Sequence, residues 1–222
     1  MSAKKISQIQ YWNSVTKRRQ PTHPVVREFV IPKIRFIEKT IKLKPKSKVL
    51  DVGCGSGFFT YYLAKRYQVT GLDFSKKMLA LNPHKRLIKA SAYQIPFKDN
   101  TFDLVFCSNL LHHLDHPLKA LKEMNRVAKK FVIASEPNRN NLAILLLGLA
   151  KKEERKSLKF STNYLVSLFK KTKLQIVTQE NLGLITPNKT PQSLIKPLLF
   201  LEKISWLKPL RAYTIIIAEK KK

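Results

Sequence analysis

The sequence predicts an α/β protein with a seven-stranded, mostly parallel sheet, helices on both faces and an antiparallel last strand. Short β-branched runs alternate with longer helix-like segments from residue 48 to residue 171. Strands separated by helices pair in parallel, because each helix returns the chain to the starting edge of the sheet. The final run, AYTIIIAEK, follows another strand with no helical repeat between them. We therefore expect it to be an antiparallel strand at the sheet edge.

The individual elements follow from this alternation. The strands are expected at residues 48–52, 68–73, 87–89, 104–108, 131–135, 174–179 and 212–218. The helices are expected at residues 58–67, 76–81, 117–127 and 162–171. Ser75 and Ser161 precede two of these helices, where a serine hydroxyl can accept a hydrogen bond from a free amide of the first turn.

Three segments fall outside the alternation and define the domain organisation that we expect. Residues 1–47 are basic and helix-like and form an N-terminal cap, and residues 48–222 form the main domain. Residues 137–160 and 183–211 are apolar and basic insertions within that domain. Loops that follow strands shape the ligand site in α/β folds. We interpret all three segments as walls or lids around one pocket.

The charge of the chain is extreme for its length. The 222 residues carry 43 Lys and Arg against 14 Asp and Glu, a formal net charge of +29. Residues 1–48 alone hold thirteen basic residues against Glu28 and Glu38. Such an excess favours an anionic partner, either nucleic acid or an acidic lipid surface. A lysine-rich, solvated surface without a partner is the alternative.

Cysteine content and hydropathy indicate the compartment. Cys54 and Cys107 are the two cysteines, and they have neither metal-ligand spacing nor the number that a disulfide framework needs. We expect a reduced, cytoplasmic protein. No apolar signal core follows the first residues, and the longest apolar run, residues 142–150, is shorter than the roughly 20 residues that span a bilayer. The protein is expected to be cytoplasmic, or peripheral to a membrane.

A glycine loop follows the first strand in VLDVGCGSGFF. Gly53, Gly55 and Gly57 give the pattern G-x-G-x-G, which lets a ligand approach the backbone closely. A dinucleotide fingerprint needs its third glycine at the position of Phe58, and a P-loop needs a G-K-[ST] sequence that is absent here. Asp51 precedes the loop, and its carboxylate would repel a phosphate and attract a cation.

A second acid specifies the ligand further. Asp73 ends the second strand, about 20 residues after the loop, where an acid can bind both ribose hydroxyls. The ligand is then nucleoside-like, lacks a phosphate and is partly cationic. S-adenosylmethionine (SAM) meets all three conditions, and S-adenosylhomocysteine is its demethylated product.

Four stretches resemble the class I SAM-dependent methyltransferases in order and spacing: VLDVGCGSGFF, GLDFSKKML, AYQIPFKDNTFDLVFCSNLLHHL and ALKEMNRVAKK. The resemblance covers about residues 45–136 and is closest to the branch of ubiquinone- and menaquinone-pathway enzymes and small-molecule O-methyltransferases. It implies a Rossmann-like fold and a set of cofactor contacts. The implied contacts are Asp51, Gly53, Cys54, Gly55 and Gly57 at the methionine end, Asp73 at the ribose, Phe74, Ser91, Ala92 and Tyr93 around adenine, and Asn109 and Leu110 beneath the methionine.

Two departures from the family pattern matter. Ser91 stands where the family usually has an acid that accepts from the adenine amino group, and a hydroxyl accepts more weakly than a carboxylate. Ala-Lys-Lys at residues 128–130 replaces the usual Pro-Gly-Gly turn. We expect a shorter turn there, with no effect on chemistry.

The acceptor site is predicted from the residues after the fourth strand. CSNLLHHLDH lacks the Asn/Asp-Pro-Pro-aromatic motif of enzymes that methylate nucleobase amines, which argues against that reaction. His113 is a candidate general base. Adjacent residues on a helix point in different directions, so only one of His112 and His113 would face the acceptor. Glu136 is a candidate catalytic residue at the end of the fifth strand. Tyr11, in an N-terminal helix, is expected to contact the cofactor. No metal cluster is apparent.

The insertions indicate the partner. LAILLLGL and SLIKPLLFLEKISWLKPL combine apolar residues with lysines and a tryptophan, a composition typical of segments that cover an apolar acceptor or lie in a membrane interface. Two amphipathic helices that pack on the sheet would look the same. We therefore predict methyl transfer to an oxygen or carbon of a small or lipid-like acceptor. An RNA methyltransferase that binds through its basic surface is the alternative, and a SAM-binding protein without catalytic activity is a third.

Overall fold

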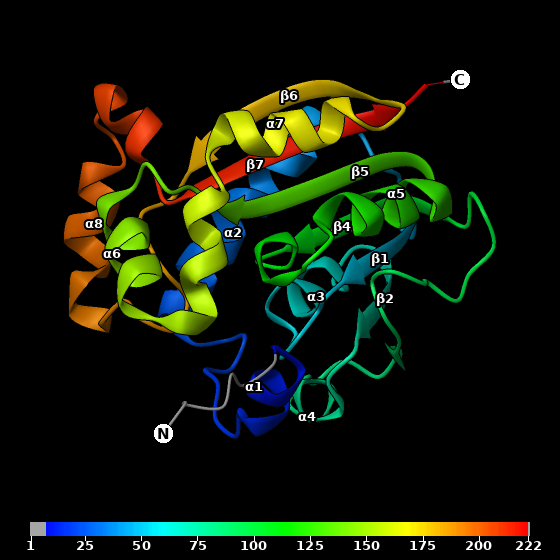
Figure 1. Ribbon diagram of the computed structural model, residues 1–222, viewed down its shortest axis with the longest axis horizontal. Coiled ribbons are helices and arrows are strands. Elements are labelled where there is room, and N and C mark those ends of the chain that lie inside the picture. Colours follow the sequence, from blue (N-terminus) through cyan, green and yellow to red (C-terminus); the bar gives the residue numbers. More distant parts are fainter. Residues whose placement is uncertain (1–7, 222) are drawn as a thin grey trace.

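The computed structural model describes residues 8–221 and has the predicted seven-stranded sheet, with the strand order β3-β2-β1-β4-β5-β7-β6 (Figure 1). The strands are β1 (Lys48–Val52), β2 (Gln68–Asp73), β3 (Leu87–Lys89), β4 (Phe102–Ser108), β5 (Ala128–Pro137), β6 (Leu174–Leu182) and β7 (Tyr213–Lys220). Strands β1 to β5 pair in parallel, and β7 is antiparallel to both of its neighbours. The antiparallel last strand is confirmed. Its expected place at the edge is wrong, because β7 inserts between β5 and β6 and leaves β6 at the edge.

Helices cover both faces of the sheet. The α-helices are α1 (Gln8–Ser14), α2 (Pro24–Thr40), α3 (Phe58–Leu63), α4 (Lys76–Ala80), α5 (Pro117–Val127), α6 (Leu142–Ala150), α7 (Thr162–Lys170) and α8 (Ile195–Leu201). The 3₁₀ segments are η1 (Leu111–His113), η2 (Lys152–Lys159), η3 (Gln192–Leu194) and η4 (Ser205–Leu210). Alternate strand residues face opposite sides, so Leu50 packs in the core beneath α5 and α7, whereas Val49 packs in the core beneath α2 and α3.

The predicted element bounds agree closely with the observed ones, and the differences have local causes. Strand β5 starts at Ala128, directly after α5, because the chain has no Pro-Gly-Gly turn to separate them. Helix α3 ends at Leu63, and the chain then closes in a turn in which the Tyr67 amide donates to the Leu63 carbonyl. The Ser75 and Ser161 side chains cap α4 and α7 as predicted.

The segments outside the β–α alternation lie at two places. Helix α1 lies beside α4, where the Ser75 hydroxyl donates to the Asn13 side chain at 2.8 Å. Helix α2 buries an apolar face in the core shared with α3. Helices α6 and α8 lie together at one end of the sheet (Figure 1). Residues 1–7 of the expected N-terminal cap lie outside the described residues. Among residues 8–221, no helix combines the length and apolar character needed to cross a membrane.

Candidate active site

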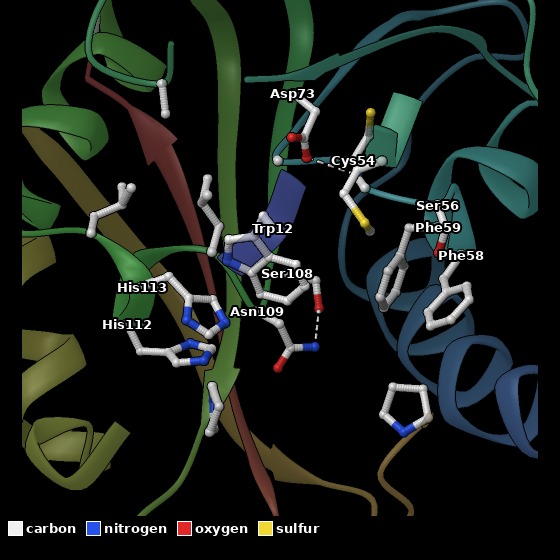
Figure 2. A pocket seen from close by; sticks show the side chains of 18 of the residues that line it. Trp12, Cys54, Ser56, Phe58, Phe59, Asp73, Ser108, Asn109, His112 and His113 are labelled. Carbon is white, nitrogen blue, oxygen red and sulfur yellow. Dashed lines mark hydrogen bonds between the residues drawn. The ribbon is translucent and has the colours of Figure 1, made fainter. Parts of the chain in front are cut away.

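A cavity of about 470 Å³ opens at the carboxyl ends of strands β1 to β5, the position at which ligands bind in open α/β sheets. Figure 2 shows His112 and His113 on one side of it and Phe58 and Phe59 on the opposite side. Two sides of the cavity wall differ in composition, and we call them the loop side and the apolar side. The loop side is lined by Gly53, Cys54, Gly55, Asp73, Phe74 and Met78, and the apolar side by Phe29, Phe58, Phe59, Ile144, Leu147 and Tyr213.

The glycine loop has a backbone that only glycine adopts readily. The φ angles of Gly53, Gly55 and Gly57 are +70°, +49° and +86°, in the left-handed region. Gly53 and Gly55 line the cavity, whereas Gly57 is not among the lining residues. A Cβ at Gly57 would lie 2.3 Å from Oδ1 of Asn82. The structure therefore places Gly57 behind the loop, where it leaves room for Asn82 to donate to the Gly55 carbonyl at 3.1 Å.

The two predicted acids lie side by side in the wall. Asp73 accepts the amides of Gly55 and Ser75 at 2.9 and 2.8 Å, which fixes its carboxylate at the end of β2. Asp51 accepts the Thr60 hydroxyl at 2.6 Å. Burial raises the pKa of Asp73, and burial together with the charge of Asp73 raises the pKa of Asp51 to about 7. A cation in the cavity would stabilise both ionised carboxylates.

The residues expected around adenine also line the cavity. Phe74, Ser91, Ala92 and Tyr93 are all part of its wall. The Ser91 hydroxyl accepts the Tyr93 amide at 3.1 Å. One lone pair of this hydroxyl is thus engaged by the chain itself, which leaves it a weaker acceptor for a ligand than the acid that the family usually has there.

Asn109 and Leu110 lie under the loop side. Asn109 has a φ of +53°, a left-handed conformation that asparagine tolerates better than most residues. The Leu110 side chain occupies the space beside Gly53, where a Cβ would lie 2.7 Å from its Cδ1. Both residues line the cavity, and the glycine at position 53 is what allows Leu110 to pack against the loop.

The histidine pair departs from the expected helical geometry. His112 and His113 lie in the 3₁₀ segment η1, and both line the cavity, with ring centroids 3.9 Å apart. His113 packs edge-on against Trp12 and its Nδ1 has no hydrogen-bond partner among the described residues. Burial and the neighbouring charges of His112 and Arg18 lower the pKa of His113 well below its ordinary value.

Glu136 does not reach the cavity. It is fully buried, and Oε1 accepts the amides of Leu110 and Leu111 at 3.0 and 2.9 Å. Its Oε2 lies 2.6 Å from Nδ1 of His112. These contacts hold η1 at the end of β4. The geometry thus favours a positioning role for Glu136 over the contact with an acceptor that the sequence suggested.

His112 is held between two carboxylates. Burial lowers the pKa of His112, but the interactions with Glu136 and Glu154 outweigh this and raise it to about 9. Glu154 belongs to η2, within the first insertion. No local pattern predicts this contact, because residues 112 and 154 approach each other only when the insertion folds back over the strand ends.

Several other lining residues were missed. Tyr11, which was expected to contact the cofactor, lines the cavity. Its neighbour Trp12 and the partly buried Arg18 also line it, and the Arg18 guanidinium carbon lies 5.1 Å from the Trp12 ring centroid. Residues 186–189 of the second insertion complete the wall. The basic and aromatic composition of residues 1–47 indicated that residues such as Trp12 and Arg18 could be functional. Composition alone did not show which of them line the cavity and which pack against the rest of the protein.

Comparison with known proteins agrees with this geometry. Residues 50–133 match a family model described as "Methyltransferase domain". This part of the chain is thus similar to a methyltransferase domain. The sequence is 42% identical over 103 residues to an uncharacterised protein of Methanocaldococcus jannaschii, and 40% identical over 106 residues to demethylmenaquinone methyltransferase of Staphylococcus haemolyticus. The matches cover 46% and 43% of this chain and 45% and 44% of those relatives, so the chain spans less than half the length of the curated relatives.

Solved structures share the fold over most of the chain. A SAM-dependent methyltransferase of Aquifex aeolicus superposes with a TM-score of 0.64 at 19% identity, covering 92% of this chain and all of that one. Another from Archaeoglobus fulgidus has a TM-score of 0.64 at 20% identity, covering 86% of this chain and 93% of that one. The Rossmann-like fold expected from the sequence is confirmed.

The cofactor of this domain family is SAM, as the sequence predicted, and the residues present fit it. Asp73 stands at the end of β2 with its carboxylate fixed by two backbone amides, as a ribose ligand requires. The paired carboxylates of Asp51 and Asp73 suit a ligand with positive charge and no phosphate. The cavity volume of about 470 Å³ is within the range of roughly 300–1,000 Å³ typical of small-molecule sites.

Proposed function

We propose that the chain is a methyltransferase that transfers the methyl group of SAM to an oxygen or carbon of a small or lipid-like acceptor. The observation that carries this proposal is the cavity itself, because its loop side holds the paired acids and its apolar side holds aromatic and aliphatic side chains. One cavity therefore offers a place for the cofactor and, next to it, a place for an apolar acceptor.

The residues of the chain would contribute mainly by placement. SAM supplies a methyl group that is already activated on a sulfonium sulfur, so alignment of donor and acceptor accounts for much of the catalysis. Asp73 and the glycine loop hold the cofactor, and the apolar side excludes water from the acceptor. His113, the candidate general base, lies in the wall, and its buried Nδ1 has no hydrogen-bond partner among the described residues.

The cofactor assignment is tested by titration calorimetry with SAM and S-adenosylhomocysteine. Asp73→Ala removes a charged acceptor of two hydrogen bonds, each worth about 1.5–3 kcal/mol, so SAM should bind at least about 100-fold more weakly. Asp103→Ala is the matched control, because Asp103 accepts the Lys48 amide at the opposite ends of the strands. Unchanged SAM affinity in Asp73→Ala would sink the assignment.

The acceptor is proposed to be apolar because of what surrounds the cavity. Ile144 and Leu147 of α6 line it from one side of the helix, while Leu146 and Leu149 of the same helix face solvent. Except for Val177, the exposed large apolar side chains of the described residues belong to the two insertions. They form what we call the apolar end surface: Leu142, Leu145, Leu146, Leu149, Leu194, Phe200, Leu201, Trp206 and Leu210.

The apolar end surface is proposed to rest on an anionic membrane. Exposed lysines at positions 196, 203 and 208 alternate with its apolar residues, and this combination favours a negatively charged lipid surface. The two parts of the surface are joined by the Asn141 side chain, which donates to the Leu210 carbonyl at 2.7 Å. One relative is named for a methyltransferase reaction on demethylmenaquinone, which supports an apolar small-molecule acceptor.

Sedimentation with vesicles tests this placement. The protein should bind vesicles that contain phosphatidylglycerol, and the double variant Leu146→Glu/Trp206→Glu should bind them at least tenfold more weakly while its SAM affinity stays unchanged. Val177→Glu is the matched control, because Val177 is exposed outside the surface. Equal vesicle binding by both variants would contradict the proposal. Binding to a single-stranded RNA probe in preference to vesicles would favour the RNA methyltransferase instead.

A further inference from the structure

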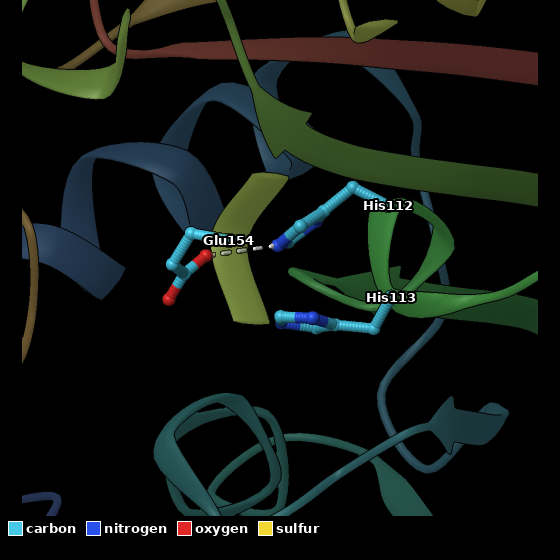
Figure 3. A group of neighbouring side chains, drawn as sticks. All are labelled: His112, His113 and Glu154. Carbon is cyan, nitrogen blue, oxygen red and sulfur yellow. Dashed lines mark ion pairs between the residues drawn. The ribbon is translucent and has the colours of Figure 1, made fainter. Parts of the chain in front are cut away.

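Three side chains with metal-ligating atoms converge at the cavity wall. His112 and His113 each offer one ring nitrogen, and Glu154 offers one carboxylate oxygen. These three atoms lie within 4.8 Å of one another. Figure 3 shows both rings extending from η1 toward Glu154 on η2. Because η1 follows β4 and η2 belongs to the insertion after β5, the group exists only in the folded chain.

One ion pair in this group has a separation close to that of two ligands bound to one ion. His112 Nε2 and Glu154 Oε2 are 3.7 Å apart, beyond the usual range for an N–H···O bond. Two ligands bound to one ion at about 2.0–2.2 Å each, with an angle near the tetrahedral value, are roughly 3.3–3.6 Å apart. The gap between these two atoms thus has nearly the width that a bridging ion requires.

The surrounding contacts select the atoms that face the ion. Glu136 engages Nδ1 of His112 at 2.6 Å, which leaves Nε2 as the free ligand atom. A carboxylate behind a ligating histidine is the usual second-shell partner at metal sites. His113 is 8% exposed, and its buried Nδ1 has no hydrogen-bond partner among residues 8–221. A buried, unpartnered nitrogen is costly unless something binds it.

The scaffold holds the two elements together without using the ligating atoms. The Lys156 ammonium on η2 pairs with Asp115 and also donates to the His113 carbonyl at 3.4 Å. Glu154, two residues earlier on η2, is therefore held in place opposite η1. Its side chain is 20% exposed.

We propose that His112, His113 and Glu154 form a site for a divalent transition-metal ion in the cavity wall. Two imidazoles and one carboxylate suit Zn²⁺, Co²⁺ or Fe²⁺. All three residues line the cavity, so the remaining coordination positions face it, as at catalytic rather than structural sites. An oxygen of the acceptor fits such a position, and this last step rests on the proposed function. The hydroxyl proton of the acceptor would pass to water as the acceptor oxygen binds the ion. The oxygen would then form the new bond to the methyl carbon, while the bond from that carbon to the sulfonium sulfur breaks and the sulfur retains the electron pair.

The test uses the full, untagged chain after treatment with a chelator. Titration with Co²⁺ should show one ion per chain, with the visible d–d absorption of a low-coordinate site. Glu154→Gln preserves the shape of the side chain and His113→Phe preserves a ring beside Trp12, and each should weaken Co²⁺ and Zn²⁺ binding at least about tenfold. His116→Ala and Glu180→Gln are the controls, since they lie outside the cluster, and they should bind like the parent protein.

Two results would overturn the metal site: no stoichiometric binding of Co²⁺ or Zn²⁺, or binding that Glu154→Gln and His113→Phe leave unchanged. Thermal unfolding of each variant identifies any that fail to fold. SAM affinity measured on the same samples separates the two proposals. A parent protein that binds SAM but neither Co²⁺ nor Zn²⁺ rejects only the metal site, and a parent protein that binds the metal but not SAM rejects only the proposed function.

Discussion

The sheet from β1 to β5 and the insertions that follow β5 and β6 are built on different principles. Leu50 and Val105 in the sheet are fully buried, whereas Leu146 and Trp206 in the insertions are 55% and 73% exposed. The family match ends at residue 133, before either insertion begins. Backbone geometry and buried acids shape the loop side, while the insertions place apolar side chains both in the cavity and on the surface. The cofactor half is thus specified internally, and the insertions are the part that can adapt to an acceptor.

Two glycines offer the most severe test of this contrast. Gly57→Ala puts a Cβ 2.3 Å from Asn82 in a left-handed conformation. Conformational strain of about 1–2 kcal/mol and overpacking of about 1–3 kcal/mol should combine with the lost Asn82 hydrogen bond. The free energy of unfolding should fall by roughly 3–5 kcal/mol. Urea unfolding monitored by circular dichroism measures this change.

Gly148→Ala in α6 is the matched variant in an insertion. Its Cβ would lie 2.7 Å from Cδ2 of Leu158, the end of a flexible side chain that can move. Alanine also favours a helix over glycine by about 1 kcal/mol, so the free energy of unfolding should change by less than about 1 kcal/mol. Equal destabilisation by the two alanines would remove the distinction between a rigid loop side and adaptable insertions.

The same contrast explains what the sequence predicted. Strands β1 to β3 were predicted residue for residue, because each is a short apolar run between turn residues. Gly53, Gly55 and Asp73 were proposed as site residues from their spacing, which reflects backbone geometry that is local in the chain, and all three line the cavity. The position of β7 between β5 and β6 was missed, because antiparallel pairing does not specify which neighbours a strand takes.

The missed parts of the site are those made by distant segments. Glu154 and His112 are 42 positions apart in the sequence, and nothing in either local pattern records their contact. His112 and His113 share one side of the wall because η1 is a 3₁₀ segment. In a helix, which was the geometry expected for LLHHL, the two side chains would point in different directions. Glu136 was recognised as unusual from its place after β5, but its burial beneath η1 depends on three backbone amides that no side-chain pattern reveals.

The buried Lys33, which packs against the apolar side, allows a test through the pH dependence of the free energy of unfolding. Lys33 of α2 is 2% exposed, donates to the Phe29 carbonyl and packs against the Phe29 and Tyr213 rings of the apolar side. Burial lowers the pKa of Lys33 from 10.5 to about 7, against the opposing effect of Glu202. The folded state therefore disfavours the charged form, so the stability contributed by this group rises between pH 7 and pH 10 and is lost as the pH falls again.

Lys33→Met should remove this dependence. From the two pKa values, the wild-type free energy of unfolding should gain roughly 3 kcal/mol relative to the variant between pH 7 and pH 10. Chemical denaturation at both pH values measures the difference, and SAM affinity should not change, because Lys33 lies behind the apolar side. A variant that follows the wild type at every pH would mean that Lys33 stays charged in the fold.

Asp51 provides the corresponding test on the loop side, through binding rather than stability. The pKa of its carboxyl is raised to about 7, first by burial and then by Asp73, and a cationic ligand favours the ionised form. SAM should therefore bind about tenfold more tightly at pH 8 than at pH 6, since one pKa unit corresponds to a tenfold change in the ionised fraction below the pKa. Asp51→Asn should bind more weakly and lose this slope, while any titration of SAM itself is common to both proteins and cancels in the comparison. An identical slope in Asp51→Asn would assign the pH dependence to another group, and a flat wild-type profile would mean that Asp51 does not sense the cofactor charge.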